Sequence, residues 1–293
     1  MKKIILILIL LIAIVSSNYA NIKVVASTTV IYDLVKEIGK DKVAVDFIAR
    51  GDQDPHFVEV LPSYMLKLRN ADIFFRIGMG LEMWSNQLID GSRNSSLKVI
   101  DLSTDIDKKE VPNYKPDASY GDVHPFGNPH YWLDPENAKV MAKEIYETLA
   151  SESHQDEAFF KKNLDEFNSR IDKKMQEWTN TMQKVKGKSV LFFHASWIYF
   201  ADRFGIKTAG FVEPKPGIAP SPSHNAELVQ IIKSKNIKTI VMENFYSDSA
   251  PNQLAQLTGV KVVKVATAVY GIKSVNSYID MIDNIVNQII QNS

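Results

Sequence analysis

The sequence contains no cysteine among its 293 residues. This absence excludes disulfide bonds, thiolate ligands for a metal ion and cysteine nucleophiles. It also removes the N-terminal cysteine to which bacterial lipid anchors are attached. We therefore expect the exported protein to be freely soluble, which favours a bacterial periplasm over the outer face of a cell with a single membrane.

An excess of charge of either sign is also missing. Lysine and arginine together number 34, and aspartate and glutamate also number 34. Binding to nucleic acid generally requires a basic stripe that neutralises phosphates. The balanced composition therefore argues against a nucleic-acid partner.

The first twenty residues have the pattern of a secretory signal peptide. Met1-Lys2-Lys3 is positively charged, and Ile4–Val15 is an unbroken apolar run. Small residues follow, with the expected cleavage site after Ala20. The run is shorter than the roughly 20 residues that a membrane-spanning helix needs. We expect residues 1–20 to be removed on export. About 270 residues then remain, which suits two domains of ordinary size.

Short apolar runs alternate with amphipathic stretches along the mature chain. The expected strands are residues 22–27, 43–48, 73–77 and 97–100, and later 189–193, 208–212, 237–242 and 260–265. The expected helices are residues 30–35, 62–69, one that opens at Pro135 behind an Asp134 N-cap, 196–204, 223–234, 250–257 and 274–291. This alternation predicts an α/β fold with two βα lobes, each containing a four-stranded, mainly parallel sheet.

A long helix is predicted between the two groups of strands. Residues 155–186 carry apolar side chains at spacings of three to five, without glycine or proline. Such a helix spans roughly 45 Å. We therefore expect an N-terminal lobe at 21–153, a rigid linking helix at 154–187 and a C-terminal lobe at 188–293. One continuous doubly wound sheet is the alternative, and the uninterrupted helix counts against it.

Residues 108–129 interrupt this alternation. The segment is rich in proline and glycine and poor in aliphatic residues, so we expect a long, mobile loop. Long loops in compact domains are often functional. His124 lies in this loop, six residues before His130.

Three histidines lie in short, turn-like contexts spread over the whole chain. They are His56 in Asp54-Pro55-His56, His130 in Asn128-Pro129-His130-Tyr131-Trp132, and His194 in Phe193-His194-Ala195-Ser196-Trp197. His194 directly follows a predicted strand, at the strand end where ligands of α/β proteins bind. Neutral imidazoles that converge from distant segments are typical of a zinc site. We therefore expect a metal-ion site between the lobes.

These strings, and the long string Asn128-Pro129-His130-Tyr131-Trp132-Leu133-Asp134-Pro135 above all, resemble the TroA-like and ZnuA-like (cluster A-I) solute-binding proteins of bacterial ABC importers. The resemblance covers essentially the whole mature chain. It implies two βα lobes joined by one long helix, one metal ion in the cleft, and delivery of that ion to a membrane permease.

The resemblance also implies the ligands. His56 and His130 match the two ligands of the first lobe, and His194 matches the third. That third ligand is histidine in zinc-type members and often glutamate in manganese-type members. A high-affinity zinc receptor is therefore the leading hypothesis, and a manganese or iron receptor of the same family is the alternative. We expect a monomer whose partners are the ion and an ABC permease.

The fourth ligand is where this sequence departs from the family. Many members have an aspartate after the last strand, whereas Thr267 and its neighbours offer no carboxylate. Water or Glu243 are the candidates for that position. Glu243 is alternatively a partner that orients a histidine. Glu213 is a weaker candidate and is expected in a turn between the lobes.

Other residues near the predicted site have two interpretations each. His124 either recruits or covers the ion, or is a solvated loop residue. Trp132 and Trp197 either form a hydrophobic shell around the ion or belong to the ordinary core.

A less favoured hypothesis is an exported zinc hydrolase, because three histidines and a water also form a catalytic zinc site. The sequence has neither a His-Glu-x-x-His helix nor a Gly-x-Ser-x-Gly turn. A surface adhesin is weaker still.

Overall fold

The computed structural model describes residues 21–114, 124–215 and 217–293. The predicted signal peptide, residues 1–20, lies outside the described residues, and so do residues 115–123 of the predicted loop. The described parts of that loop, 108–114 and 124–129, contain no helix or strand. Among the helices in the described ranges, none has the length and apolar character to cross a membrane.

Two four-stranded parallel sheets form the centre of the molecule. The first has the strand order β2-β1-β3-β4 and the second the order β6-β5-β7-β8, so the two sheets repeat one topology. The strands are β1 (Ile22–Thr28), β2 (Val43–Ala49), β3 (Ile73–Arg76), β4 (Lys98–Asp101), β5 (Ser189–Phe192), β6 (Lys207–Phe211), β7 (Thr239–Glu243) and β8 (Lys261–Val265). This confirms the predicted α/β fold with two sheets. The continuous single sheet is wrong.

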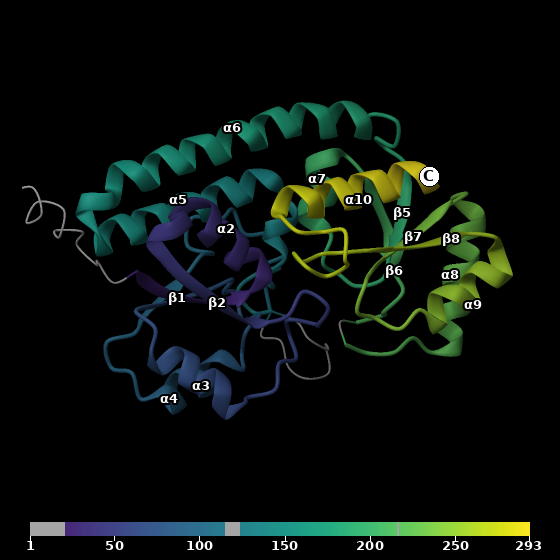
Figure 1. The fold of residues 1–293 in the computed structure, drawn as a ribbon. Coiled ribbons are helices and arrows are strands. Elements are labelled where there is room, and N and C mark those ends of the chain that lie inside the picture. The colour runs from purple at the N-terminus through teal and green to yellow at the C-terminus, as the bar shows by residue number, and fades with distance from the viewer. Residues whose placement is uncertain (1–20, 115–123, 216) are drawn as a thin grey trace, which may run out of the picture.

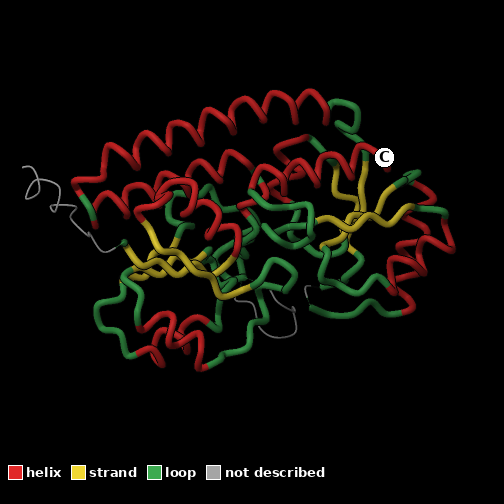
Figure 2. The backbone as a smooth tube through the Cα atoms, viewed as in Figure 1, coloured by secondary structure: helices red, strands yellow, loops and turns green. Residues whose placement is uncertain are grey.

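Helices cover both faces of each sheet, which explains why the central strands are apolar on both sides. In the first sheet α3 and α4 pack on one face and α2 and α5 on the other; in the second, α8 and α9 pack opposite α7 and α10 (Figures 1 and 2). The helices are α2 (Thr29–Gly39), α3 (Pro62–Arg69), α4 (Ser85–Ser92), α5 (Pro135–Glu152), α6 (Glu157–Met182), α7 (Ile198–Phe204), α8 (Pro222–Ser234), α9 (Ser249–Thr258) and α10 (Tyr278–Asn292).

Helix α6 is the long helix that the sequence predicted, and it has 26 residues. It begins at Glu157, after a short 3-10 turn at His154–Asp156, and ends at Met182, so it is somewhat shorter than the apolar pattern. Its buried side chains include Phe160, Phe167 and Ile171. It packs against α5 and α2 at one end and α10 at the other, and so lies along both sheets (Figure 1). The lobe boundaries at 153 and 188 remain predictions.

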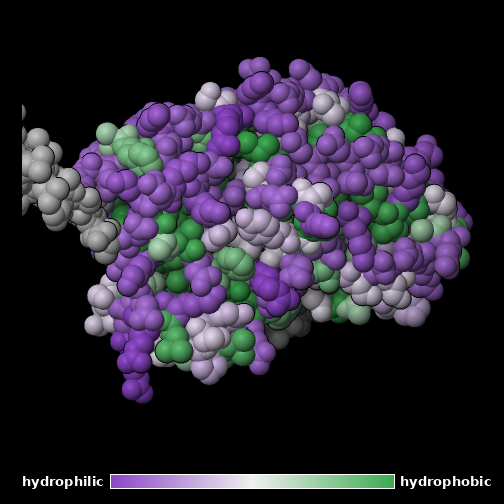
Figure 3. Space-filling view, viewed as in Figure 1, coloured by the Kyte–Doolittle hydropathy of each residue, from purple (hydrophilic) through white to green (hydrophobic). Residues whose placement is uncertain are grey.

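The largest hydrophobic cluster runs without a break from one sheet to the other. It contains Phe75 of β3, Phe167 of α6, Phe192 of β5 and Ile285 of α10. Hydrophilic residues cover most of the face in Figure 3, with hydrophobic residues in small groups. A shared core of this kind fixes the carboxyl ends of the two sheets relative to each other, because close-packed interiors resist deformation.

Candidate metal centre

Two of the predicted ligands, His56 and His130, each lie in a local turn of the same type. Asp54 Oδ1 accepts hydrogen bonds from the backbone N–H of His56 at 3.0 Å and from its ring Nδ1 at 2.7 Å. Asn128 Oδ1 accepts from the backbone N–H of His130 at 3.1 Å and from its Nδ1 at 2.9 Å. In both cases the acceptor lies two residues before the histidine, the usual span of an Asx turn. The intervening proline has a fixed φ that stiffens the turn.

The third predicted ligand, His194, lies two residues beyond the end of β5. Its Nδ1 is 2.7 Å from Oε2 of Glu213, which lies two residues beyond the end of the neighbouring strand β6. Both residues are buried. The sequence placed Glu213 in a turn between the lobes and gave it no partner, whereas the structure assigns it to His194.

These contacts determine which ring nitrogen faces the cleft. An ionised carboxylate only accepts hydrogen bonds, so Nδ1 of His56 and of His194 carries the ring proton. The same holds for His130, because Asn128 Oδ1 also accepts from a backbone N–H. Nε2 is therefore the ring nitrogen through which each of these histidines, as a neutral imidazole, can bind a metal ion.

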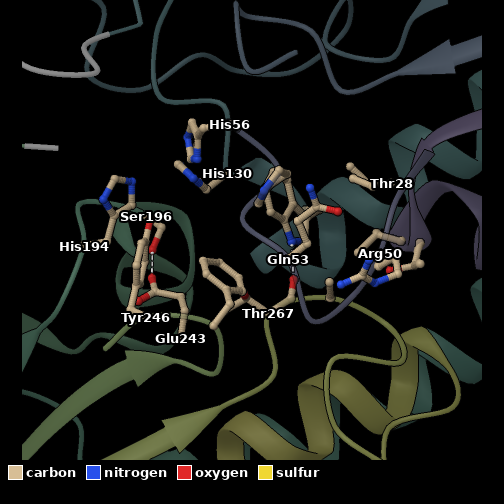
Figure 4. A pocket seen from close by; sticks show the side chains of 17 residues that line it. Thr28, Arg50, Gln53, His56, His130, His194, Ser196, Glu243, Tyr246 and Thr267 are labelled. Carbon is tan, nitrogen blue, oxygen red and sulfur yellow. Dashed lines mark hydrogen bonds between the residues drawn. The ribbon is translucent and has the colours of Figure 1, made fainter. Parts of the chain in front are cut away.

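The three rings converge in space. One ring nitrogen from each of His56, His130 and His194 lies within 4.8 Å of the others. The ring centroids are 5.1 Å apart for His56 and His130, and 5.4 Å apart for each pair that includes His194. The imidazole groups of His56 and His194 are each only 4% exposed. Figure 4 shows the three rings close together at one side of a pocket.

Burial and charge act differently on the three imidazoles. Burial, reinforced by the neighbouring histidines, lowers the pKa of His130 well below its ordinary value. Burial alone would lower the pKa of His194, but the hydrogen bond to Glu213 and the charge of Glu243 outweigh it and raise that pKa. Burial would raise the pKa of Asp54, yet the hydrogen bonds from His56 lower it. The carboxylates beside His56 and His194 thus favour a positive charge, either a proton or a cation, at the centre of the site.

Glu243 lies at the end of β7 and lines the same pocket. Its Oε1 accepts hydrogen bonds from Ser196 Oγ and from Trp197 Nε1, the latter at 2.9 Å, while burial raises its pKa. Its Oε2 is buried and has no hydrogen-bond partner among the described residues. Glu243 does not belong to the group of ligand atoms within 4.8 Å.

The tryptophans and Thr267 form part of the wall. The Trp132 ring centroid is 5.2 Å from that of His130, and Trp132 Nε1 donates to the carbonyl of Thr267 at 2.8 Å. Trp197 contacts Glu243 rather than a histidine ring. Trp132 thus shields the site as one interpretation of the sequence had it, and Trp197 positions Glu243.

Two further side chains border the histidines. Tyr246 has a ring centroid 5.6 Å from that of His194, and its hydroxyl is hydrogen-bonded to Asp54. It therefore links the turn that holds His56 to the second sheet, and no sequence pattern pointed to it. His124 stacks on His56 with a centroid separation of 5.2 Å, and lies 6.2 Å from His130. It is thus only partly exposed to solvent.

A family model described as "Zinc-uptake complex component A periplasmic" matches residues 24–292 of this chain. The manganese ABC transporter substrate-binding lipoprotein PsaA of Streptococcus mitis is 25% identical over 251 residues, which cover 83% of this chain and 78% of the relative. The zinc-binding lipoprotein AdcA of Streptococcus pneumoniae strain R6 is 26% identical over 245 residues, 82% of this chain and 49% of AdcA.

Solved structures have the same fold. A crystal structure of ZnuA superimposes with a TM-score of 0.80 at 22% identity and covers 93% of this chain and 99% of that one. The Mn-bound periplasmic metal binding protein from Candidatus Liberibacter asiaticus superimposes with a TM-score of 0.78 at 22% identity, covering 92% of this chain and 98% of that one.

Proposed function

Because this chain belongs to the family of periplasmic zinc-uptake components, the metal-binding substrate-binding proteins of ABC transporters, we propose that it is a high-affinity receptor for Zn²⁺. It binds the ion through Nε2 of His56, His130 and His194. Family members are binding proteins and not enzymes, so the zinc hydrolase is not pursued.

The observation that carries the proposal is the shared orientation of the three imidazoles. Each Nδ1 donates to an oxygen acceptor, and one ring nitrogen of each histidine lies within 4.8 Å of the other two. Partners of this kind fix the ring orientation and make the ligand more basic. Ordinary core packing does not explain why three buried histidines have ring centroids only 5.1–5.4 Å apart.

The choice of zinc over manganese rests on ligand chemistry. Relatives named for manganese and for zinc are similarly distant from this chain. Imidazoles suit zinc, whereas manganese prefers sites rich in carboxylate oxygen. No carboxylate oxygen of the described residues lies in the group of ligand atoms within 4.8 Å, since both Asp54 and Glu213 are engaged with ring Nδ1 atoms.

The remaining parts of the proposal concern location and partners. The signal-peptide pattern and the family description support export to the periplasm, where we propose that the protein acts as a soluble monomer. An ABC permease at the inner membrane then receives the ion. The residues at 21–153 and 188–293 form the two lobes, with the site between them, and α6 joins them.

Equilibrium dialysis of the mature protein against Zn²⁺ and Mn²⁺ tests the site. The wild type should bind one zinc per chain, and binding should be lost when positions 56, 130 and 194 are all alanine. His154→Ala is the matched control, because this histidine is exposed on the short turn before α6. A triple variant that still binds one zinc would show that the ligands are wrong. Tighter binding of manganese than of zinc would overturn the choice of metal.

A further inference from the structure

His124 lies beside His56 and His130, and its distance from His56 is the one that metal-bound imidazoles adopt. Zinc–nitrogen bonds of about 2.0–2.1 Å in a tetrahedral site keep ring centroids roughly 5 Å apart. The centroids of His124 and His56 are 5.2 Å apart, within the 5.1–5.4 Å found among the other three rings. The 6.2 Å separation from His130 leaves His124, like Glu243, outside the group of ligand atoms within 4.8 Å, so full tetrahedral placement needs a closing movement of roughly 1 Å.

The ring of His124 presents the same nitrogen as the other three. It is hydrogen-bonded to the backbone of Gly80, and because this bond raises its pKa, a ring N–H is the donor to the Gly80 carbonyl. Nε2 has no hydrogen-bond partner and is buried, so Nδ1 is the donor. A buried acceptor without a partner costs free energy. A metal ion beside Nε2 would remove that cost.

Glu243 is the competing candidate, because its Oε2 is also buried without a partner, but the hydrogen bonds of its Oε1 argue against it. Its Oε1 already accepts from Ser196 and Trp197. Turning the carboxylate toward the ion would strain or break these two buried bonds, each of which costs about 1–3 kcal/mol when a buried group loses its partner. His124 gives up no bond of Nε2 by moving inward.

We propose that His124 is the fourth ligand of the metal ion, through Nε2, and that it completes a site of four imidazoles. This inference rests on the proposed function, since it needs the other three histidines to hold the ion. It assigns a role to a histidine from the segment between β4 and α5, and it replaces Glu243 and water at the fourth position.

The position of His124 in the chain also bears on how the metal ion is released. It lines a groove with His130 and His194, beside residues 110–114 of the same segment. Near its start this segment is tied to α7, where Tyr199 Oη accepts from the backbone N–H of Lys109 at 3.0 Å and Asp202 pairs with Lys109 Nζ at 2.7 Å. Binding of His124 would therefore cover the side of the ion that faces this groove and slow its release.

Proton NMR of the Co²⁺-loaded mature protein counts the bound imidazoles. Every histidine that binds through Nε2 keeps its Nδ1 proton, which gives one exchangeable, strongly shifted signal. The wild type should show four such signals, His124→Ala three, and the exposed control His154→Ala four. His124→Ala should also bind zinc at least about tenfold more weakly, the lower end of the range for losing a partner of a metal site. Added free imidazole should restore part of that affinity.

Three signals in both the wild type and His124→Ala, with equal zinc affinity, would overturn the inference. Three signals together with a changed Co²⁺ absorption spectrum in Glu243→Gln would overturn it in favour of Glu243. Either result would leave the proposed function intact. Failure of that function has a different signature, which is retained binding when positions 56, 130 and 194 are alanine.

Discussion

Glu213 Oε2 lies 2.7 Å from Nδ1 of His194, and both side chains are buried at the ends of neighbouring strands. Asp54 and Asn128 occupy the corresponding place beside His56 and His130. The three imidazoles are therefore oriented by three separate acceptors, two carboxylates and one amide. These acceptors fix the tautomer with the proton on Nδ1 in all three histidines, independently of a bound ion.

Removal of the Glu213 carboxylate should weaken zinc binding without removing a ligand. We expect Glu213→Ala to lower zinc affinity by about 10- to 100-fold, because His194 loses the partner that fixes its ring. Glu213→Gln should lie between the wild type and Glu213→Ala. Competition with a chromogenic chelator measures the change. Glu227→Gln on α8, where the side chain is 74% exposed, is the control, and an equal loss there would contradict the assignment.

The turn before His56 gives a second, independent test. Asp54→Ala should cost about tenfold or more in zinc affinity, while Asp54→Asn keeps an acceptor for the ring and should cost less. Asp52, exposed two residues earlier, provides the control Asp52→Ala, which should bind as the wild type does. The same chelator competition applies. Equal affinities for Asp54→Ala and the wild type would show that this turn does not orient the ligand.

Asp134 has two structural roles, and its replacement should destabilise the fold. It caps α5 by accepting from the N–H of Glu136, and it forms a bidentate pair with Arg203 of α7 at 2.7 and 2.8 Å. We expect Asp134→Ala to lower the free energy of unfolding by about 2–4 kcal/mol, from the lost cap and the broken, partly buried pair. Urea unfolding measures it. Asp134→Asn retains the cap and should lose less; an equal loss would assign the whole effect to the charge.

Asp33 makes stability depend on pH away from the metal site. Burial raises the pKa of this α2 carboxyl to about 6, although the N–H of Tyr278 donates to it at 2.8 Å. The folded state thus holds the proton more tightly than the unfolded chain, whose carboxyl has the ordinary value of 3.8. Stability should therefore rise as pH falls through 6, and the gain is complete below the unfolded value.

Asp33→Asn removes this titration and retains an acceptor for Tyr278. The variant should be more stable than the wild type by about 1–3 kcal/mol at pH 8, at about 1.4 kcal/mol per pKa unit. The difference should shrink as the pH falls and vanish below 3.8, where Asp33 is protonated in both the folded and the unfolded state. Thermal unfolding across this pH range checks the sign. A constant difference would mean that Asp33 does not titrate differently on folding.

The sequence predicted most of what local patterns encode. The strands alternate with helices at nearly the predicted residues, Asp134 caps α5, and the apolar spacing identified α6. Helix α4 was missed because its eight residues, Ser85–Ser92, bury only Leu88 among large apolar side chains. A helix with so little apolar periodicity gives no clear signal.

The partners of the histidines differ in how visible they are in the sequence. Asp54 and Asn128 each precede a ligand in an Asx-Pro-His string, a signal that could have identified both. Glu213 is 19 residues from His194 and becomes its neighbour only because β5 pairs with β6. Tyr246 likewise approaches the site through tertiary packing, which no local sequence pattern reveals. For His124 the sequence left two interpretations open, and only tertiary packing shows that it lies beside His56.

Elemental analysis of the protein purified from its native compartment tests the central claim most directly, because it reports the ion that the site holds in the cell. The account predicts about one zinc per chain in the wild type and in His154→Ala, and none in the variant with alanine at positions 56, 130 and 194. A wild-type protein that carries manganese or iron instead of zinc, or a triple variant that still carries zinc, would contradict it.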